Sequence, residues 1–260
     1  MQQRTVRPLQ KKDMDTAIGK DRQLNNKKVI VLGGSSGLGL ATAQAAAIAG
    51  AQVIIVSGNE KRMREALATL PANAEGYSAD LGRNENVQHF FSEVGTFDHL
   101  VYTAGDQLTM SELAEMDLEQ AKHFFTIRYW GALAAIKYGS ANISPKGSIN
   151  LISGIASSRP GKGWALAASV CGAIEGLTRA MAVELAPIRV NCVLPGVIKT
   201  NLWNTFSEEQ RNGFYATVGN SLLVKRVGEA EDIAQAFIYL MQQSFCTGQC
   251  LIVDGGAQLV

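Results

Sequence analysis

The sequence predicts an α/β fold in which helices cover both faces of a parallel sheet. Two observations support this prediction: short apolar segments bounded by turn residues, and segments of helical periodicity that alternate with them. Strands that are apolar throughout are typical of parallel sheets, because both of their faces are buried. No internal repeat or linker divides the pattern, so we expect one domain over residues 27–260.

The expected elements follow one another in chain order. Seven segments carry the apolar, strand-like pattern: 29–33, 52–58, 74–81, 98–105, 147–153, 187–196 and 249–256. Six segments carry helical periodicity and connect them: 37–50, 60–70, 84–94, 117–139, 164–186 and 230–243. A strand that is followed by a helix and another strand is typical of a parallel crossover connection, so consecutive strands are expected to run parallel.

Composition argues against several classes of protein. Lysine and arginine (24) nearly balance aspartate and glutamate (23), so no overall field favours nucleic acid or an acidic substrate. The four cysteines have no CxxC spacing and the three histidines are isolated, which disfavours a metal site and predicts a reducing, cytoplasmic setting. No continuous apolar run reaches the ~18 residues of a membrane span, so no membrane partner is expected.

The beginning of the chain differs from the rest. Residues 1–28 hold eight lysines and arginines against three aspartates, and no apolar stretch marks a secretory signal. We expect residues 1–26 to form a basic, flexible or partner-tethered extension. Contact with an anionic surface is the alternative.

A glycine-rich turn follows the first predicted strand. Its sequence, GGSSGLG over 33–39, ends an apolar segment and opens a helical one. Glycine lets the backbone turn tightly and approach a pyrophosphate, whose charge is stabilised at the N-terminus of the helix. This position in a strand–helix–strand unit predicts a dinucleotide site. Its predicted contacts are Gly33, Ser35, Ser36, Gly37, Leu38 and Gly39.

The end of the second predicted strand indicates which dinucleotide binds. An acidic residue there would accept a hydrogen bond from the ribose 2′-hydroxyl of NAD. No carboxylate stands at 57 or 58, whereas Ser57, Asn59 and Lys61, with Arg62, are suited to a 2′-phosphate. We therefore expect NADP, with NAD as the less favoured cofactor. The alternative interpretation of Lys61 and Arg62 is the solvated start of a helix.

Four further motifs accompany the glycine turn: Asp80-Leu81, YTAG (102–105), LPGVIKT (194–200) and VDGG (253–256). Together they resemble the short-chain dehydrogenase/reductase family over about residues 27–257, with YTAG in place of the family's NNAG. The resemblance implies a Rossmann-type, doubly wound, parallel seven-stranded sheet in three αβα layers. It also implies a homotetramer, or else a homodimer, formed through the helices at 117–139 and 164–186 and the last strand.

The resemblance extends the cofactor site beyond the glycine turn. It implies that an acidic residue caps the adenine pocket, that backbone groups after the sixth strand hold the nicotinamide carboxamide, and that a threonine hydroxyl binds a phosphate. The implied contacts are Asp80, Leu81, Thr103, Ala104, Gly105, Pro195, Gly196, Val197, Ile198 and Thr200.

The catalytic positions that the resemblance implies are all substituted. The family uses Asn, Ser, Tyr and Lys, of which the tyrosine protonates the carbonyl oxygen and the lysine lowers its pKa. Aligning EGLTRAMAVELAP with the family places Ala167 at the tyrosine and Cys171 at the lysine. Gly154 stands at the serine and Arg128 at the asparagine. No Tyr-x-x-x-Lys occurs anywhere in the sequence, so no other register restores the pair.

Three residues are the predicted substitutes at this site. Arg128 is suited to hold a carboxylate or carbonyl oxygen by paired hydrogen bonds; a surface salt bridge is the alternative. Ser153 is placed to donate to a substrate oxygen; the alternative is that it only ends the strand. Trp164 is placed to form an aromatic wall of the substrate site; the alternative is packing in the core or at an interface. Arg159 and Lys162, in the loop before Trp164, are candidates for recognising substrate charge.

Loss of the tyrosine changes the expected chemistry. Reduction of a ketone forms an alkoxide, whose protonation by a general acid contributes typically 10²–10⁴-fold. Hydride transfer to an imine, an iminium or a conjugated carbonyl has less need of that acid. We therefore expect an NADP(H)-dependent oxidoreductase with a non-standard active site that acts on a small organic substrate.

Two other classes of function remain open. One is an inactive NADP-binding pseudoenzyme or sensor, and the other is an isomerase or cyclase without redox chemistry. The missing tetrad and the arginine at 128 resemble a branch of reductases that includes fungal alkaloid reductase/Diels–Alderases.

Overall fold

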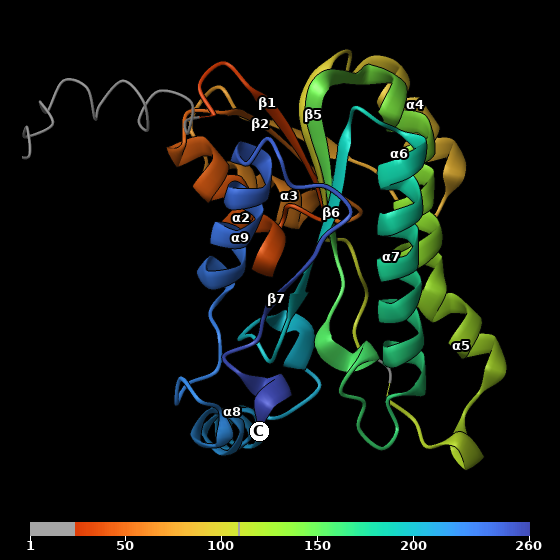
Figure 1. The fold of residues 1–260 in the computed structure, drawn as a ribbon, viewed down its shortest axis with the longest axis vertical. Helices are drawn as coiled ribbons and strands as arrows, with labels where there is room; N and C mark the ends of the chain where they lie inside the picture. Colours follow the sequence, from red (N-terminus) through yellow and green to blue (C-terminus); the bar gives the residue numbers. More distant parts are fainter. Residues whose placement is uncertain (1–23, 109) are drawn as a thin grey trace, which may run out of the picture.

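The structure, a computed structural model, describes residues 24–108 and 110–260. Most of the predicted basic extension, residues 1–23, lies outside the described residues. One sheet runs through the described part and helices cover its two faces, which gives three layers (Figure 1).

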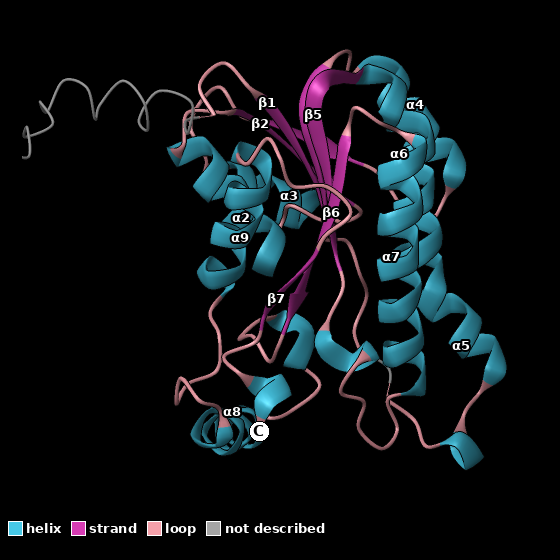
Figure 2. Ribbon diagram, in the orientation of Figure 1, coloured by secondary structure: helices cyan, strands magenta, loops and turns pink. Residues whose placement is uncertain are grey.

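Seven parallel strands form the sheet, in the order β3-β2-β1-β4-β5-β6-β7 (Figure 2). Their bounds are β1 Lys28–Leu32, β2 Gln52–Ser57, β3 Glu75–Ser78, β4 Phe97–Tyr102, β5 Ile143–Ile152, β6 Arg189–Pro195 and β7 Cys250–Val253. The chain builds outward from β1 to β3, returns to pair β4 with β1, and then builds in the opposite direction. The predicted doubly wound, seven-stranded sheet is confirmed, and its switch point lies between β1 and β4.

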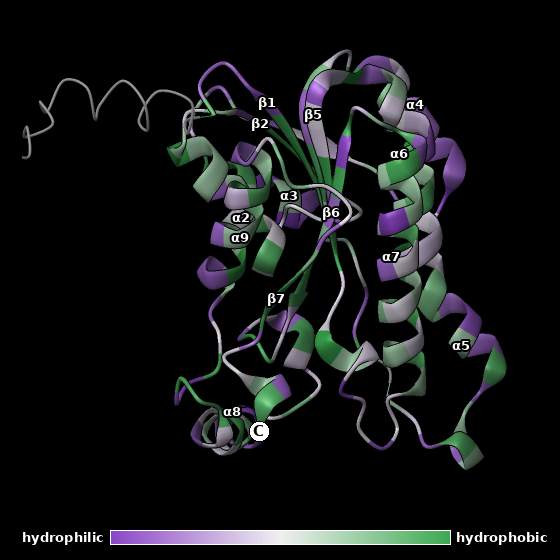
Figure 3. Ribbon diagram, viewed as in Figure 1, coloured by the Kyte–Doolittle hydropathy of each residue, from purple (hydrophilic) through white to green (hydrophobic). Residues whose placement is uncertain are grey.

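The helices form two layers (Figure 1). One layer contains α2 (Gly37–Ile48), α3 (Glu60–Leu67) and α9 (Ala230–Gln242), and the other contains α4 (Asn84–Glu93), α5 (Leu118–Phe125), α6 (Ala132–Gly139) and α7 (Ala165–Glu184). Alternate residues of β1 lie on opposite faces of the sheet. Val29 and Val31 pack toward the first helix layer, and Ile30 and Leu32 pack toward the second. Hydrophobic residues are accordingly concentrated along the strands in Figure 3.

The structure differs from the predicted elements in two places. The single helix expected over 117–139 is two helices, α5 and α6, joined by a π-helical segment, Thr126–Gly131. A further helix, α8 (Glu208–Ser221), was not predicted, although Ser207 and Gln210 form a capping box at its start. Its two glycines and scattered apolar residues weaken the helical pattern. Short 3₁₀ turns complete the fold at Leu113–Glu115, Ser140–Asn142, Ile155–Ser157, Asn201–Trp203 and Ala257–Leu259.

Helix α7 has the length and apolar composition of a membrane span, which no other helix in the described ranges has. This character is also common in core helices of soluble folds. Here Ile174 and Leu177 of α7 are buried in the core cluster that contains β5 and β6 residues. Packing against the sheet therefore accounts for its apolar side.

A buried polar network joins the central strands. His99 on β4 lies in register with Ser148 on β5, and its Nδ1 is 2.9 Å from the Ser148 Oγ. Asn150 donates to the same hydroxyl at 2.8 Å. Burial lowers the pKa of His99 to about 4, and the nearby charge of Arg189 acts in the same direction. The imidazole is therefore neutral at pH 7 in the folded chain.

This network gives the fold a defined acid sensitivity. Because the unfolded chain binds a proton at His99 near pH 6.5 and the folded chain only near 4, stability falls as pH drops through that window. We expect His99 to account for about 3 kcal/mol of lost unfolding free energy between pH 7 and pH 4. Urea denaturation of the wild type and His99→Gln at several pH values measures this contribution. A substitution at the exposed His123 is the control, and an unchanged pH dependence in His99→Gln would contradict the prediction.

Candidate active site

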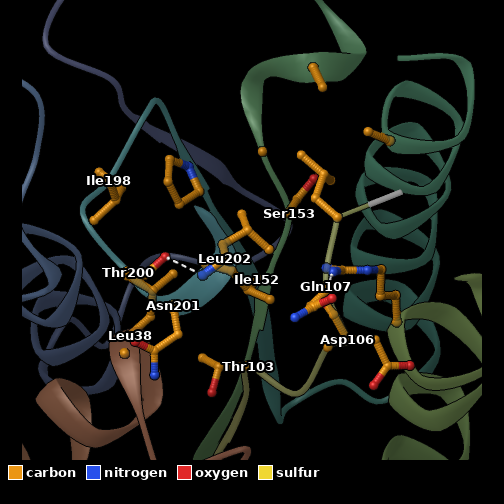
Figure 4. Close-up of a pocket in the computed structure, with 18 of the residues that line it drawn as sticks. Leu38, Thr103, Asp106, Gln107, Ile152, Ser153, Ile198, Thr200, Asn201 and Leu202 are labelled. Atoms are coloured by element: carbon orange, nitrogen blue, oxygen red, sulfur yellow. Dashed lines mark hydrogen bonds between the residues drawn. The ribbon is translucent and has the colours of Figure 1, made fainter. Parts of the chain in front are cut away.

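A cavity of about 1150 Å³ lies at the carboxyl ends of the strands. Figure 4 shows Leu38 and Thr103, Thr200 and Ile198, and Ser153 arranged around it. Turns after β1, β4, β5 and β6 all contribute, so chain segments far apart in sequence meet there. All predicted site residues except Lys61 line this cavity: Gly33, Ser35, Ser36, Gly37, Leu38, Gly39, Ser57, Asn59, Asp80, Leu81, Thr103, Ala104, Gly105, Arg128, Ser153, Trp164, Pro195, Gly196, Val197, Ile198 and Thr200.

The glycine turn brings the backbone of β1 against that of β4. Gly33 has φ +86°, and a Cβ there would lie 2.6 Å from the amide nitrogen of Ala104. A Cβ on Gly39 would collide with the Gly33 carbonyl and the Thr103 hydroxyl. Helix α2 begins with Ser36 as N-cap, whose side chain makes no capping hydrogen bond and leaves the first N–H groups open. Open N–H groups beside a crowded glycine turn fit a pyrophosphate.

The adenosine end of the cavity is built by the end of β2. The Oγ atoms of Ser35 and Ser57 lie 2.8 Å apart, and Ser57 also accepts a hydrogen bond from the Asn59 amide at 3.2 Å. Asn59 in turn caps α3 by accepting from the Arg62 amide at 2.8 Å. Arg62 lines the cavity, whereas the Lys61 ammonium lies 4.0 Å from Glu65 on the outer side of α3. The basic side chain that lines this end is therefore that of Arg62, and Lys61, which was also expected at the cofactor, lies outside the lining.

The segment after β6 forms the opposite wall. Gly228 donates to the Val197 carbonyl at 3.0 Å and accepts from Lys199 at 2.9 Å, which fixes the path of the chain. A Cβ on Gly196 would lie 2.9 Å from the Asp254 Cα, so the LPGVIKT and VDGG motifs pack on each other. Thr200 accepts from the Leu202 amide at 3.4 Å, and Figure 4 marks this bond.

The described residues at the substrate end do not include the tyrosine and lysine that serve proton transfer in the family. Of the described residues that line the cavity, none is a tyrosine, lysine, histidine or glutamate. Ala167 is buried, and burial raises the pKa of the Cys171 thiol, which keeps it protonated. Ser153 donates to the Cys171 backbone carbonyl at 3.1 Å, so its proton is already engaged with α7. No group of three or more metal-ligating side chains gathers in the described ranges.

Arg128 enters the cavity from the π-helical segment. Its Nη2 donates to the backbone carbonyl of Asp106, and its guanidinium lies over the Phe124 ring at 4.7 Å. Its Nε is buried and has no hydrogen-bond partner among the described residues. Burial lowers the pKa of Arg128, but a guanidinium stays charged in proteins. The arginine is therefore a fixed cation at the substrate end.

A buried tyrosine supports the turn that carries Arg128. Tyr102 is 1% exposed and its hydroxyl donates to the Ile127 carbonyl within the π-helical segment. A Cβ at Gly131 would collide with this hydroxyl and lie 2.8 Å from the Leu81 carbonyl. Burial raises the pKa of Tyr102, so it stays protonated and engaged. Sequence reasoning missed this role, because the YTAG motif shows only that an asparagine has been replaced.

The other predicted substrate residues have different positions. Trp164 is the N-cap residue of α7 and packs against Gly161, where a Cβ would lie 3.3 Å from the indole. Arg159 lines the cavity and donates to the Ala257 carbonyl. Lys162 lies outside the lining and forms a 2.7 Å ion pair with Glu112. Further lining residues that the sequence did not indicate include Asp106, Trp203, Val218, Leu222 and Ala257, most of them from segments without a recognised motif.

Comparison with known proteins agrees with this geometry. A family model described as "Enoyl-(Acyl carrier protein) reductase" matches residues 33–258. The short-chain dehydrogenase/reductase ATR9 of Stachybotrys chlorohalonatus is 35% identical over 91% of this chain and 98% of its own. A small-chain dehydrogenase solved in complex with NADPH is 34% identical with a TM-score of 0.81, covering 91% of this chain and 100% of that one. The MalC reductase/Diels–Alderase of Malbranchea aurantiaca is 28% identical with a TM-score of 0.86, covering 93% and 100%.

The contact between Tyr102 and Gly131 predicts a coupled effect on stability. We expect Gly131→Ala to lower the free energy of unfolding by about 2 kcal/mol, because the new methyl group overpacks a filled site. The cost should be smaller by about 1 kcal/mol in a Tyr102→Phe background, which removes the opposing hydroxyl. Urea denaturation of the double-mutant cycle measures this coupling.

The control for this cycle is Gly172→Ala, at a helical glycine with open space around it. This substitution should leave stability unchanged or raise it by about 0.5–1 kcal/mol. Equal costs of Gly131→Ala in the two backgrounds would show that the tyrosine hydroxyl does not set the requirement for glycine.

Proposed function

The chain belongs to the short-chain dehydrogenase/reductase family, and we propose that it is an NADP(H)-dependent oxidoreductase that acts on a small organic substrate without a catalytic tyrosine. One observation carries the proposal. The cavity that contains the dinucleotide cradle continues, without a break in its lining, to a chamber lined by Arg128, Ser153 and Trp164. A substrate in that chamber would lie beside the reactive end of the cofactor.

The residues present fit a nicotinamide dinucleotide. The Gly33–Gly39 turn leaves space that side chains would fill, and the open start of α2 suits the pyrophosphate. The segment 195–198 would hold the carboxamide and Thr200 a phosphate. When bound and reduced, such a cofactor supplies a hydride. The protein's own residues then have to orient the acceptor and stabilise the charge that develops on it.

The substituted tetrad narrows the class of acceptor. Ala167 and Cys171 provide neither a phenol nor an ammonium group, so protonation of an alkoxide has no dedicated donor. We propose an acceptor that does not require one: an imine or iminium, or a conjugated carbonyl that spreads the charge over several atoms. Simple ketones would then be poor substrates, by about the 10²–10⁴-fold that a general acid contributes.

Stopped-flow measurement of nicotinamide absorbance tests this function directly. Purified protein is mixed with NADPH and a panel of cyclic imines, enones, quinones and matched simple ketones. We expect turnover with at least one conjugated or imine acceptor and little with the ketones. Tight NADPH binding without turnover of any acceptor would instead support an NADP-binding sensor. Product formation at constant absorbance would support an isomerase or cyclase, an alternative favoured by the similarity to a reductase/Diels–Alderase.

NADP is the proposed cofactor because Arg62 lines the adenosine end beside Ser57 and Asn59, with no carboxylate at the end of β2. The NADPH complex of a similar dehydrogenase supports the same choice. Arg62 also forms no ion pair with other described residues, so its charge is available to a phosphate.

This choice of cofactor predicts a difference between two adjacent basic residues. We expect Arg62→Ala to weaken NADPH binding about 10-fold or more, because a charged hydrogen-bonding partner of the 2′-phosphate is lost. Binding of NADH, which lacks that phosphate, should be nearly unchanged. Lys61→Ala is the matched control and should affect neither cofactor, because its side chain lies toward Glu65. Fluorescence titration measures all the affinities, and equal losses for NADPH and NADH in Arg62→Ala would contradict the assignment.

The homotetramer, the alternative homodimer and the cytoplasmic location stay predictions. Exposed apolar side chains at Trp130 and Val183 (57% and 81% exposed) are compatible with a subunit contact through the π-helical segment and α7. Neither nucleic acid nor a membrane is proposed as a partner.

A further inference from the structure

We propose that Arg128 binds the substrate oxygen on which negative charge develops, and that the substrate is therefore a conjugated carbonyl compound rather than an iminium cation. This inference rests on the proposed function and selects between its two classes of acceptor. Four properties of the site carry it: a fixed guanidinium, unused N–H groups, the charge of the surrounding chamber, and the lack of a tyrosine or lysine among the described residues that line it.

The guanidinium is held in one place by contacts on three sides. It lies on the Phe124 ring, its Nη2 donates to the Asp106 carbonyl, and its Nη1 occupies the space beside Gly105. A Cβ at Gly105 would lie 2.7 Å from that Nη1 atom. These contacts already restrict the side-chain rotamers of Arg128 before a ligand arrives. Less conformational entropy is therefore lost when a ligand binds. The group is therefore preorganised.

The backbone beneath Arg128 is fixed as well. Arg128 lies in the π-helical segment rather than in a regular α-helix. The Tyr102 hydroxyl donates a hydrogen bond to the Ile127 carbonyl of that segment. Gly131 makes room for the tyrosine hydroxyl. A buried hydrogen bond at this point opposes a return to ordinary α-helical register, which would turn the arginine to another direction.

Some N–H groups of Arg128 are not used by the described residues. The hydrogen bonds of the described residues use Nη2 of Arg128, and its buried Nε has no partner. The Nη1 atom, beside Gly105, donates to no described residue either. A substrate oxygen that gains negative charge would accept from Nη1, because charge-assisted hydrogen bonds to guanidinium are strong.

The charge of the chamber disfavours a cationic substrate. Five charged side chains line the whole cavity in the described ranges: Arg62 and Asp80 at the adenosine end, and Asp106, Arg128 and Arg159 at the substrate end. Asp106 and Arg159 belong to exposed residues and carry opposite charges, whereas Arg128 is partly buried. An iminium beside Arg128 would therefore meet like charge where solvent screens it least, which costs binding free energy.

The chemical step balances without an acid at the oxygen. A reduced nicotinamide, when bound, would supply a hydride from its own C–H bond to the β-carbon of an α,β-unsaturated carbonyl. The electron pair of the C=C bond moves toward the carbonyl and forms an enolate, whose oxygen lies against Arg128. The α-carbon then takes a proton from water. The products are the saturated carbonyl compound and the oxidised nicotinamide, so two electrons pass from cofactor to substrate.

An arginine suits this step better than it suits ketone reduction. An alkoxide keeps its whole charge on one strongly basic oxygen and must take up a proton there. A guanidinium, which stays charged in proteins, does not release one readily. An enolate shares its charge between oxygen and carbon and is far less basic, so a hydrogen-bonding cation is sufficient until solvent protonates the carbon.

The test uses stable analogues, so it does not depend on turnover. Dimedone, a cyclic 1,3-diketone, is largely its enolate at neutral pH, and N,N-dimethylpiperidinium is a cation of similar size and shape. Isothermal titration of the full chain saturated with NADP⁺ compares the two. We expect the enolate to bind and the cation to bind at least about 10-fold more weakly. We also expect enolate affinity to fall when the pH is lowered enough to protonate the diketone.

Variants at Arg128 identify the group responsible. Arg128→Gln should weaken enolate binding about 10-fold or more and leave NADP⁺ affinity unchanged. Arg128→Lys should retain part of the affinity, because it keeps the charge without the paired N–H geometry. Lys162→Gln, which removes a cation outside the cavity lining, is the control and should have no effect. Circular dichroism checks that each variant is folded, and the lysine variant serves if the glutamine variant is not.

The possible results separate this inference from the function it rests on. Tighter binding of the cation than of the enolate, or enolate binding that Arg128→Gln and Arg128→Lys leave unchanged, would overturn the inference while the oxidoreductase proposal stands. Failure of the wild type to bind NADP⁺ or NADPH at all would overturn the proposed function itself.

Discussion

The close contact between two backbone segments, the turn after β1 and the end of β4, is the constraint on which the site depends. Gly33 lies against the amide of Ala104, and Gly39 lies against the Gly33 carbonyl, with no space for side chains. This contact sets the distance between the two halves of the sheet at its switch point. The same contact fixes the positions of the α2 N-terminus, of the YTAG segment and of the chamber that follows it. A cofactor cradle that consists mainly of backbone can persist while the side chains that perform the chemistry change.

Much of the fold was predictable because it depends on patterns that recur locally. The apolar strands, the glycine turn and the alternation with helices predicted the sheet and its winding, which β1 and β4 confirm. The π-helical segment was not predictable, since one extra residue per turn hardly alters an apolar pattern over Thr126–Gly131. Helix α8 lacked a clear apolar stripe. Which of two adjacent basic residues faces the cavity, Lys61 or Arg62, depended on the direction of α3 and could not be read from composition.

The substrate end shows several substitutions that fit one another. Tyr102 stands where the resemblance implies an asparagine, and its hydroxyl reaches the turn that carries Arg128. Arg128 itself stands at another asparagine position and needs the small residue at 105 beside it. Ala167 and Cys171 then face a chamber in which burial keeps the thiol protonated. These contacts support the proposal that the site has been rebuilt around Arg128.

The fit between Tyr102 and Gly131 also couples two positions that lie far apart in the sequence. The Tyr102 hydroxyl occupies the space that a Cβ at 131 would need. A side chain at 131 therefore fits best with a smaller residue at 102, and a tyrosine at 102 fits best with glycine at 131. In a library of variants of this chain, the residues tolerated at one position would consequently depend on the residue at the other.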